Sequence, residues 1–448
     1  MGAEDLHPIT VPDPMIYKCI FSISLFVALL PAASVAELDT TEQAMVSHID
    51  RTNASAMELL VDIVNINSGT MNFDGVKAVA DALIPEFTAL GFDARFEGGA
   101  SWERAGHLVA DHHVEGDGPK LLLIGHLDTV FEPDSPFQTY EDLGGGLARG
   151  PGISDMKGGN IIMLQALRAL DGVGLLADMD ITVIMTGDEE LSGRPLSLSK
   201  GHLIEAAQWA DIALGFENGD GKPETANISR RSSSGWTLEV IGKPAHSSQV
   251  FQEHVGAGAI YEASRILMDF YTTLRREELL TFNPGRIMGG TTVTHDRASN
   301  SGTTFGKNNV VAEKAIITGD IRAISPEQLS RVQETMRGLI TDNLPHTSAS
   351  ISFDEGYPPL APTAGNRQLL SLYSQASQDL GLGAVEAVNP LNAGASDISF
   401  TAAHVDMAID GLGMSGTAGH TIEETGVLAA LPNQAKRAAV LMYRLLDQ

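Results

Sequence analysis

Acidic residues and a histidine stand in four separate segments of the sequence, three of which begin where a short apolar run ends. The residues are His126 and Asp128, Asp155, Glu189 and Glu190, and Glu217. Short apolar runs are typical of buried parallel strands, whose carboxyl ends meet at one edge of an open α/β sheet. Carboxylates gathered there repel one another, and a divalent cation removes that repulsion. Imidazole and carboxylate ligands without thiolate favour zinc, with cobalt or manganese as alternatives.

The spacing within the two pairs indicates how such a site could work. His126 and Asp128 are two residues apart at a strand end, so their side chains can share one face and the aspartate can hold the second imidazole nitrogen. Glu189 and Glu190 are adjacent, so they point to opposite sides of an extended segment. One can bind the metal while the other accepts a proton from a water molecule that the metal has made more acidic.

The elements that must position these residues alternate between strands and helices, which is typical of an α/β layer. Strands are predicted at residues 121–124, 180–185 and 211–216, and helices at 41–65, 75–90, 158–170 and near 201–209. The same pattern returns later in the chain, with a helix at 366–380, a strand at 407–410 and a helix at about 429–446.

Between these two parts, after about Asn227, the pattern changes. Longer, half-exposed strands are predicted at 236–241 and 315–322, and helices at 255–273 and 326–343. We therefore expect an α/β domain formed by residues 37–228 and 356–448, interrupted by a smaller α+β sandwich domain at 229–355.

The composition excludes several classes of protein. In 448 residues, 29 Lys+Arg stand against 57 Asp+Glu, which gives a formal net charge of −28. Nucleic-acid backbone and anionic membrane surfaces both attract positive charge, so neither is an expected partner. The single cysteine, Cys19, allows no internal disulfide and no cysteine-based zinc site. The sequence also has no Gly-x-Ser-x-Gly motif and no Gly-x-Gly-x-x-Gly that opens a helix after a strand, so a serine nucleophile and nucleotide binding are not indicated.

The N-terminal residues are expected to be a signal peptide and not part of the fold. A basic start at 15–18 (MIYK) precedes a twelve-residue apolar run at 19–30 and a small-residue cleavage site at 34–36 (SVA). The run is too short to span a bilayer as a helix, so no stable membrane anchor is expected. The acidic residues 1–14 fit no part of this order, so we expect the true start at Met15. Cleavage after Ala36 leaves a chain without cysteine, which suits a periplasmic or secreted protein.

Eight motifs carry a resemblance to a known family. In chain order they are GHLDTV (125–130), GPGISDMKGG (150–159), TGDEELSG (186–193), GFENG (215–219), GKPAHSS (242–248), NNVVAEKAIITGDIR (308–322), GASDISF (394–400) and DGLGMSGTAGHTIEE (410–424). Together they resemble the dinuclear zinc metallopeptidases that include glutamate carboxypeptidase, acetylornithine deacetylase, succinyl-diaminopimelate desuccinylase and peptidase T. The chain is most similar to the glutamate carboxypeptidase branch. Each motif alone is weak, but the ordered set is specific.

The resemblance implies two metal ions bridged by Asp155 and a water molecule. His126 and Glu217 would complete the protein ligands of one metal, and Glu190 and His420 would complete those of the other. Zinc is the expected metal at both positions, with cobalt or manganese also possible. The fold that the resemblance implies is a zinc-exopeptidase-like α/β catalytic domain, interrupted by a smaller lid and dimerisation domain.

The resemblance also implies roles beyond the metal ligands. Glu189 would be the general base and later the proton donor to the leaving amine, and Asp128 would orient His126. The peptide bond between Asp155 and Met156 would be cis. Taken singly, these residues have ordinary alternatives; Asp155, for example, could be a helix N-cap, a role that aspartate often fills.

The smaller domain is expected to supply substrate contacts. His246, reaching the active site of a partner subunit, would stabilise the oxyanion of the tetrahedral intermediate. Arg322 would grip the free carboxylate of the substrate, and Asn309 would lie in the same pocket. Gly394 would contact the substrate through its backbone. The chain would accordingly be a homodimer that associates through its lid.

Three basic residues near these motifs have less specific interpretations. Arg230 and Arg231 could be substrate contacts, but we interpret them as surface charges. Lys157 is expected to fix its local loop and not to take part in chemistry.

These residues and the family resemblance together predict a zinc-dependent exopeptidase. It would hydrolyse a peptide or amide bond next to a free C-terminal carboxylate through a metal-bridging water, with a small peptide as substrate. An N-acyl-amino-acid deacylase is an alternative because the same site cuts either kind of amide. A non-catalytic protein that captures small ligands is a third possibility, although pure capture needs no base such as Glu189.

Overall fold

The computed structural model describes residues 38–116, 118–297 and 301–446. The predicted signal peptide, with Cys19, lies outside these residues, as does the start that we expect at Met15. Among the helices of the described ranges, none combines the length and apolar character that crossing a membrane requires.

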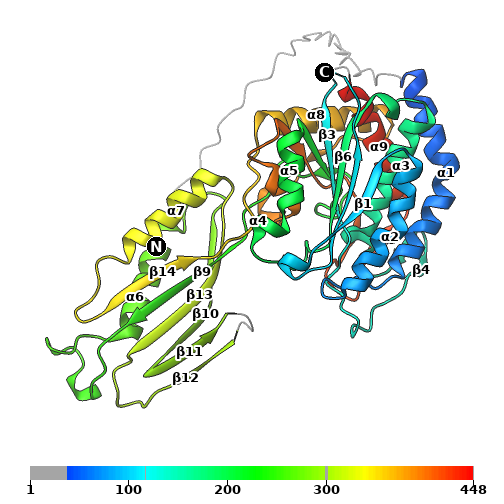
Figure 1. The fold of residues 1–448 in the computed structure, drawn as a ribbon. Coiled ribbons are helices and arrows are strands. Elements are labelled where there is room, and N and C mark those ends of the chain that lie inside the picture. The colour runs from blue at the N-terminus through cyan, green and yellow to red at the C-terminus, as the bar shows by residue number, and fades with distance from the viewer. Residues whose placement is uncertain (1–37, 117, 298–300, 447–448) are drawn as a thin grey trace, which may run out of the picture. The chain divides into compact units, whose positions relative to one another are not determined.

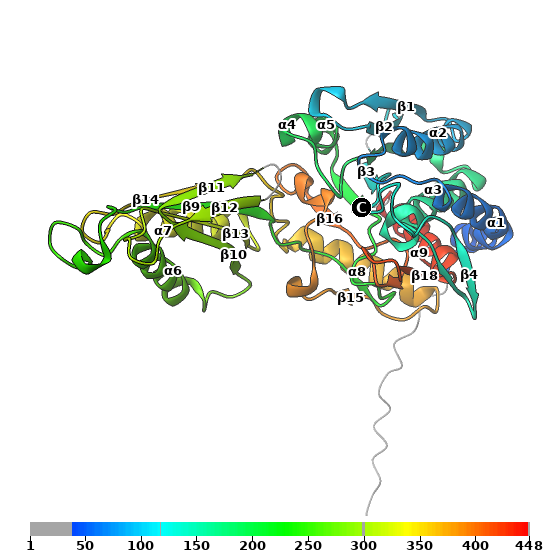
Figure 2. The same ribbon diagram turned by 90° about the horizontal axis from the view of Figure 1, so that it is seen from below.

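A six-stranded sheet forms the centre of the first domain (Figures 1 and 2). Its strands, in spatial order, are β1 (Asp93–Gly98), β2 (Gly106–His112), β6 (Asp180–Thr186), β3 (Lys120–His126), β7 (Ile212–Gly215) and β16 (Met407–Ile409). The last four run parallel to one another, whereas β1 and β2 pair antiparallel at one side. The structure confirms the strands predicted from the apolar runs.

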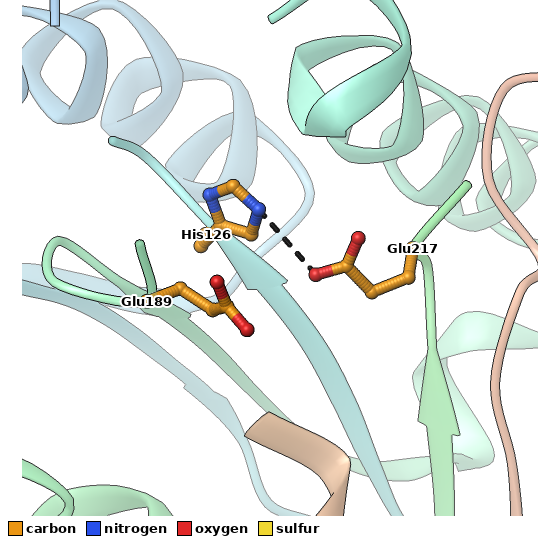
Figure 3. A group of neighbouring side chains, drawn as sticks. All are labelled: His126, Glu189 and Glu217. Carbon is orange, nitrogen blue, oxygen red and sulfur yellow. Dashed lines mark ion pairs between the residues drawn. The ribbon is translucent and has the colours of Figure 1, made fainter. Parts of the chain in front are cut away.

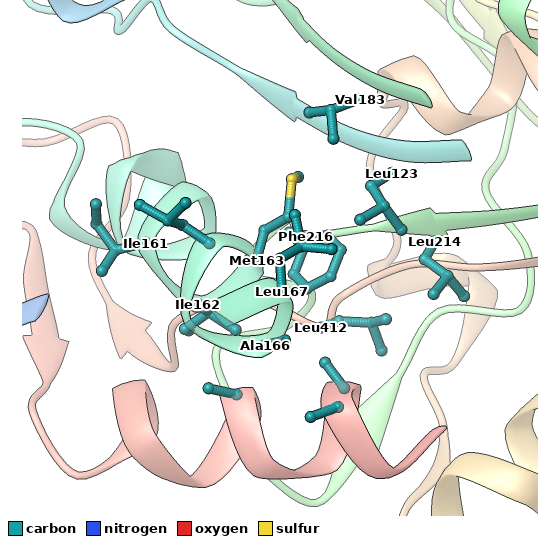
Figure 4. Packing of buried hydrophobic residues seen from close by; sticks show 14 of the residues in the cluster. Leu123, Ile161, Ile162, Met163, Ala166, Leu167, Val183, Leu214, Phe216 and Leu412 are labelled. Atoms are coloured by element: carbon teal, nitrogen blue, oxygen red, sulfur yellow. The ribbon is translucent and has the colours of Figure 1, made fainter. Parts of the chain in front are cut away.

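Helices cover both faces of this sheet. They are α1 (Thr40–Val64), α2 (Phe73–Ala89), α3 (Gly158–Gly172), α4 (Leu196–Ser199), α5 (Gly201–Trp209), α8 (Ala364–Asp379) and α9 (Ala430–Leu445). Alternate residues of β3 enter different hydrophobic clusters: Leu121 and Leu123 pack in the cluster of α1, α3 and α9, while Leu122 and Ile124 pack in the cluster of α5. Figure 4 shows the first cluster, where α3 packs against Leu123 and its neighbours on two other strands.

The second domain is built on a four-stranded antiparallel sheet. Its strands are β10 (Thr281–Gly290), β13 (Lys314–Arg322), β9 (Ser234–Ile241) and β14 (Ser348–Phe353) in spatial order. Helices α6 (Ala259–Leu274) and α7 (Pro326–Leu339) pack on one face and share a separate hydrophobic cluster with β9 and β13 (Figure 2). A hairpin of β11 (Thr292–Asp296) and β12 (Ser301–Phe305) completes this domain. The fold is therefore the predicted α/β domain with a smaller α+β domain inserted.

Local sequence signals explain where several helices begin. At α1, Asp39 accepts a hydrogen bond from the Glu42 N–H and the Glu42 carboxylate accepts one from the Asp39 N–H, which is a capping box. At α7, Ser325 is the N-cap and Pro326 occupies the first turn. Helix α6 begins at Ala259, later than predicted, because Gly256 and Gly258 have left-handed backbone angles that a helix does not allow.

Two smaller sheets connect distant parts of the first domain. One contains β17 (Gly416–Thr417), β18 (Thr425–Val427), β5 (Leu147–Arg149) and β4 (Glu141–Gly144), and the other pairs β8 (Thr225–Ala226) with β15 (Glu386–Ala387). The pairing of β18 with β5 places the 418–424 loop beside the segment that carries Asp155. Sequence positions about 270 residues apart therefore meet at one site.

Candidate metal centre

His126, at the carboxyl end of β3, is buried among carboxylates. Its Nε2 atom lies 3.2 Å from Asp155 Oδ1 and 3.4 Å from Glu217 Oε1. Its Nδ1 atom lies 3.0 Å from the carbonyl oxygen of Asp128 and 3.4 Å from Asp128 Oδ1. Asp128 therefore holds the Nδ1 edge of the imidazole ring, and Nε2 on the opposite edge points toward the other carboxylates. Figure 3 shows His126 between Glu217, at the end of β7, and Glu189.

His420 approaches the same centre from the loop between β17 and β18. Its Nε2 atom lies 3.1 Å from Asp155 Oδ2 and 3.1 Å from Glu190 Oε2. The two carboxylate oxygens of Asp155 thus face different histidines. This is the arrangement expected of a carboxylate that bridges two cation positions.

The donor atoms are close enough to share cations. Possible ligand atoms of His126, Glu189 and Glu217 all lie within 4.8 Å of one another, and so do those of His126, Asp155 and Glu190. Imidazole nitrogen and carboxylate oxygen are the donors that zinc uses in catalytic sites. The residues present therefore fit a divalent metal ion.

The ionisation of the acidic groups agrees with a site that attracts positive charge. Burial and the neighbouring Glu217 raise the pKa of Glu189 well above its usual value, and burial raises the pKa of Glu190 to about 7. Burial also raises the pKa of Asp155, but hydrogen bonds from His126 and His420 outweigh burial and hold this pKa below its usual value. Hydrogen bonds with Asp155 and Glu190 raise the pKa of His420 to about 11. The two glutamates thus show the effect of burial among other acids, and Asp155 and His420 show the effect of carboxylate–imidazole pairing.

Asp128 holds the loop of the two glutamates as well as His126. Its Oδ1 atom accepts the Glu189 N–H at 3.0 Å, and its Oδ2 atom accepts the Glu190 N–H at 3.1 Å and the Thr70 hydroxyl at 2.7 Å. The carboxylate therefore sets the position of a metal-ligand candidate and of the predicted base at once. The sequence predicts that Asp128 orients His126, but it does not predict the contacts of Asp128 with Glu189 and Glu190.

The Asp155 segment is held by a residue that the sequence reading did not single out. The buried carboxylate of Glu424 accepts the N–H groups of Gly152, Ser154 and Asp155 at 2.9–3.1 Å, together with the Ser154 hydroxyl. The peptide bond from Asp155 to Met156 is cis, as the resemblance implies. Glu424 is the last residue of the motif 410–424. It is fully buried, which the motif itself does not indicate.

The interpretation of Arg230 and Arg231 as surface charges is wrong. Arg230 is 4% exposed; its guanidinium pairs with Asp410 at 2.7–2.9 Å and donates to the carbonyl of Gly394 at 3.0 Å. Arg231 donates to two backbone carbonyls of the 390–391 turn and to Thr281. Both lie on the segment that crosses from the first sheet to the second, and this segment runs through the interior. Asp410 Oδ1 also accepts the Glu217 N–H at 3.3 Å, so Arg230 braces a metal-ligand candidate.

Lys157 takes the structural part that its sequence position indicated. It is fully buried, and its ammonium group donates to the carbonyl of Ile66 at 2.8 Å. Burial lowers its pKa to about 7.

The substrate-contact residues predicted in the second domain lie apart from the metal centre. His246 is exposed and bonds Ser248 through Nδ1, while the carbonyl of its neighbour Asn309 accepts the Ser247 N–H. Arg322, at the end of β13, lies 3.2 Å from Asp320. Within the described part of the chain, no hydrogen bond or ion pair joins these residues to the metal-ligand candidates.

A parallel sheet whose strand ends gather imidazole and carboxylate donors around a buried acid is the arrangement of a metallohydrolase. Residues 122–445 match the profile of peptidase family M20/M25/M40. The chain belongs to this family and is a hydrolase of the metallopeptidase class.

Individual relatives agree with this assignment. Carboxypeptidase G2 of Pseudomonas sp. (strain RS-16) is 26% identical over 406 residues, which cover 87% of this chain and 89% of the relative. Succinyl-diaminopimelate desuccinylase of Methylobacterium radiotolerans is 30% identical over 206 residues, covering 43% of this chain and 50% of the relative.

Solved structures of similar fold include aminopeptidase PepT from Bacillus cereus, with a TM-score of 0.66 and 18% identity over 88% of this chain and 98% of that one. The M20 family metallo-carboxypeptidase Sso-CP2 from Sulfolobus solfataricus has a TM-score of 0.60 and 13% identity over 88% and 99%. At this level of identity the likeness concerns the fold, which is the one described above.

Proposed function

We propose that the chain is a dinuclear zinc carboxypeptidase that hydrolyses the peptide or amide bond next to a free C-terminal carboxylate. The observation that carries the proposal is the position of Asp155, whose two oxygens face His126 and His420 separately. His126 and Glu217 would hold one zinc ion, and Glu190 and His420 would hold the other. The similarity to a carboxypeptidase along 87% of the chain supports this activity over that of the desuccinylases, which match about half as much.

The residues of the chain would share the work of hydrolysis. Bound zinc would polarise the scissile carbonyl group and lower the pKa of water at the site. Glu189 would accept a proton from the attacking water and pass it to the departing amine, since its carboxylate lies within 4.8 Å of ligand atoms of His126 and Glu217. Asp128 would keep Glu189 at the site through the Glu189 N–H.

The second domain would supply recognition of the substrate. Arg322 would pair with the terminal carboxylate, because a guanidinium fork matches carboxylate geometry. Asn309 and the backbone of Gly394 would complete the pocket, and His246 of a second copy would stabilise the oxyanion. This arrangement requires a homodimer through residues 229–355. Exposed apolar residues on α6 and on the edge strand β10, among them Ile260, Tyr261, Tyr271 and Ile287, support such a contact, and light scattering would give the mass in solution.

We also propose that the protein is exported to the periplasm or the medium. The basic, apolar and small-residue order of residues 15–36 supports export. N-terminal sequencing of the protein recovered from outside the cytoplasm would then begin at Glu37.

The deciding experiment uses the chain from Glu37 onward, loaded with zinc. Dipeptides ending in glutamate, the same peptides amidated at the C-terminus, and N-acetyl amino acids are compared with and without chelator. We expect chelator-sensitive cleavage of the free-acid dipeptides only. Faster cleavage of the N-acetyl amino acids would instead identify a deacylase, which the desuccinylase relatives make a second candidate.

Glu189→Gln tests the base within the same assay. We expect unchanged zinc content and a kcat lower by about 10²–10⁴-fold, which is the range for loss of general acid–base catalysis. Glu58→Gln, an exposed change on helix α1, is the matched control and should keep full activity. Zinc binding without hydrolysis in the unaltered protein would favour a ligand-capturing function.

A further inference from the structure

The segments that connect the two sheets lie against the loop that carries Glu189. The outgoing segment before β9 and the returning segment after β14 pair with each other: Ser233 and Tyr357 exchange backbone hydrogen bonds of 3.1 and 2.9 Å. From this pair, the hydroxyl of the half-buried Tyr357 reaches the loop. It donates to the carbonyl oxygen of Glu189 at 3.0 Å and lies 2.9 Å from the Ser192 hydroxyl.

A buried ionic cluster keeps Tyr357 in place. Lys200 is fully buried, and its Nζ atom lies 3.0 Å from Asp188 Oδ1 and 3.0 Å from Asp397 Oδ1. The same Asp397 oxygen is 3.0 Å from the Tyr357 hydroxyl, and the aromatic ring of Tyr357 lies 5.6 Å from Lys200 Nζ. Phe400 packs against the ring edge-on, with centroids 5.0 Å apart. A tyrosine held on this many sides has a defined position.

The Tyr357 hydroxyl has two possible hydrogen-bond acceptors, one of which is on Glu189. A hydroxyl donates one hydrogen bond, and two acceptors, Asp397 and the Glu189 carbonyl, lie within reach. Asp397 already has Lys200 and the Thr186 hydroxyl as donors. The Tyr357 hydroxyl therefore lies between two acceptors at equal distance and links the carbonyl of Glu189 to Asp397, while Ser192 can donate to the Tyr357 oxygen.

The peptide groups on either side of Glu189 are therefore held by two different parts of the molecule. Asp128, at the end of β3, accepts the N–H, and Tyr357, on the returning segment, donates to the carbonyl. Arg194 and Leu196 add hydrogen bonds to Glu355 on the same segment. We propose that Tyr357 is a positioning residue for the general base and ties the placement of Glu189 to the segment that joins the two domains. The inference rests on the proposed role of Glu189 as that base.

Tyr357→Phe tests the proposal because it removes the hydroxyl and keeps the ring. We expect a kcat about tenfold lower, with KM and zinc content unchanged, since a misplaced base slows the chemical step without altering substrate binding. Tyr373→Phe is the matched control. Its hydroxyl is fully buried and donates to Gln434 at 3.0 Å in the core, so this variant should lose at least as much stability and no turnover.

A double-mutant cycle with Glu189→Gln separates positioning from a general structural effect. If Tyr357 acts through Glu189, Tyr357→Phe should leave the residual rate of the Glu189→Gln enzyme unchanged. A kcat of Tyr357→Phe within twofold of the unaltered enzyme, or the same tenfold loss in both backgrounds, would overturn the inference. Full activity of Glu189→Gln would remove the base assignment, and this inference with it, whereas an inactive Glu189→Gln beside a fully active Tyr357→Phe would remove the inference alone.

Discussion

Asp128 is the residue on which the two halves of the site depend. One carboxylate, fully buried, lies 3.4 Å from His126 Nδ1 and accepts the N–H groups of Glu189 and Glu190. It therefore orients an imidazole that would bind metal and fixes the backbone of the residue that would move the proton. The two N–H groups bond to different oxygens, so both oxygens must be hydrogen-bond acceptors.

Asp128→Asn should damage metal binding and turnover together. In the variant, an amide NH₂ group replaces one of the two carboxylate oxygens. This group cannot accept the N–H that the oxygen accepted, so the hydrogen bond to Glu189 or to Glu190 must be lost. We expect zinc affinity to fall by about 10–100-fold, which is the usual effect of losing a group that orients a metal ligand. Competition with a chelator measures the affinity, and kcat is measured at saturating zinc. Thr70→Val, which removes only the hydroxyl that bonds Asp128, is the control; equal affinities in Asp128→Asn and the unaltered enzyme would contradict this account.

The sequence predicted some site residues from position and others only from resemblance. His126 and Glu217 follow buried strands, so the rule that ligands gather at the carboxyl ends of parallel strands is enough to place them. His420 lies in a loop with a positive backbone φ angle, where no local pattern marks a ligand. Arg230 was misread because its partner, Asp410, is 180 residues away, and a single sequence does not show which buried charges meet.

At the scale of elements, the Asp155 segment depends on contacts from another part of the chain. Residues Ile153–Lys157 form a tight irregular turn before α3, and Gly152 begins it with a φ angle of +74°. The N–H groups of Gly152, Ser154 and Asp155 point to the carboxylate of Glu424, which β18 brings alongside β5. This carboxylate replaces the helical partners that such a turn lacks.

Glu424→Ala should therefore unfold more readily and bind zinc less tightly. Three buried N–H groups would lose their acceptor, and we expect the free energy of unfolding to fall by about 3 kcal/mol, measured by urea denaturation. Glu423→Ala, on the adjacent exposed residue, should change it by less than about 0.5 kcal/mol. A Glu424→Ala protein as stable as the Glu423→Ala protein would show that water satisfies these groups.

The elements themselves were predictable where burial dominates. The strands β3, β6 and β7 are largely apolar and buried almost throughout. Helix α1 buries apolar residues at helical spacing, and α3 and α9 are buried over most of their length. The strands β1, β10 and β14 have largely polar or alternating exposure, and their pairing depends on neighbours distant in the sequence, so they were not predicted. For the same reason the sheet order could not be derived from the apolar runs alone.

For the whole molecule, the candidate metal centre gathers buried and half-buried acids within a chain whose net charge is −28. In metal-free protein, several groups hold protons more tightly when folded than when unfolded. Burial raises the pKa of Glu190 to about 7 from 4.5, and hydrogen bonds with Asp155 and Glu190 raise that of His420 to about 11 from 6.5. The Glu190 excess extends over pH 4.5–7 and the His420 excess from 6.5 upward. Lys157 acts in the opposite direction above pH 7, because burial lowers its pKa to about 7 from 10.5. We therefore expect the folded state to bind more protons than the unfolded chain between about pH 5 and 7.

The free energy of unfolding of chelator-treated protein should consequently fall as the pH rises from 5 to 7. Each excess bound proton contributes a slope of about 1.4 kcal/mol per pH unit. Zinc would take the place of these protons, so its stabilising effect should be larger at pH 7 than at pH 5. Urea unfolding at both pH values, with and without zinc, measures the difference. Glu190→Gln removes one of the titrating groups and should flatten the metal-free profile below pH 7. A metal-free profile that rises with pH, or one that Glu190→Gln leaves unchanged, would mean that the cluster does not hold these protons in the folded protein.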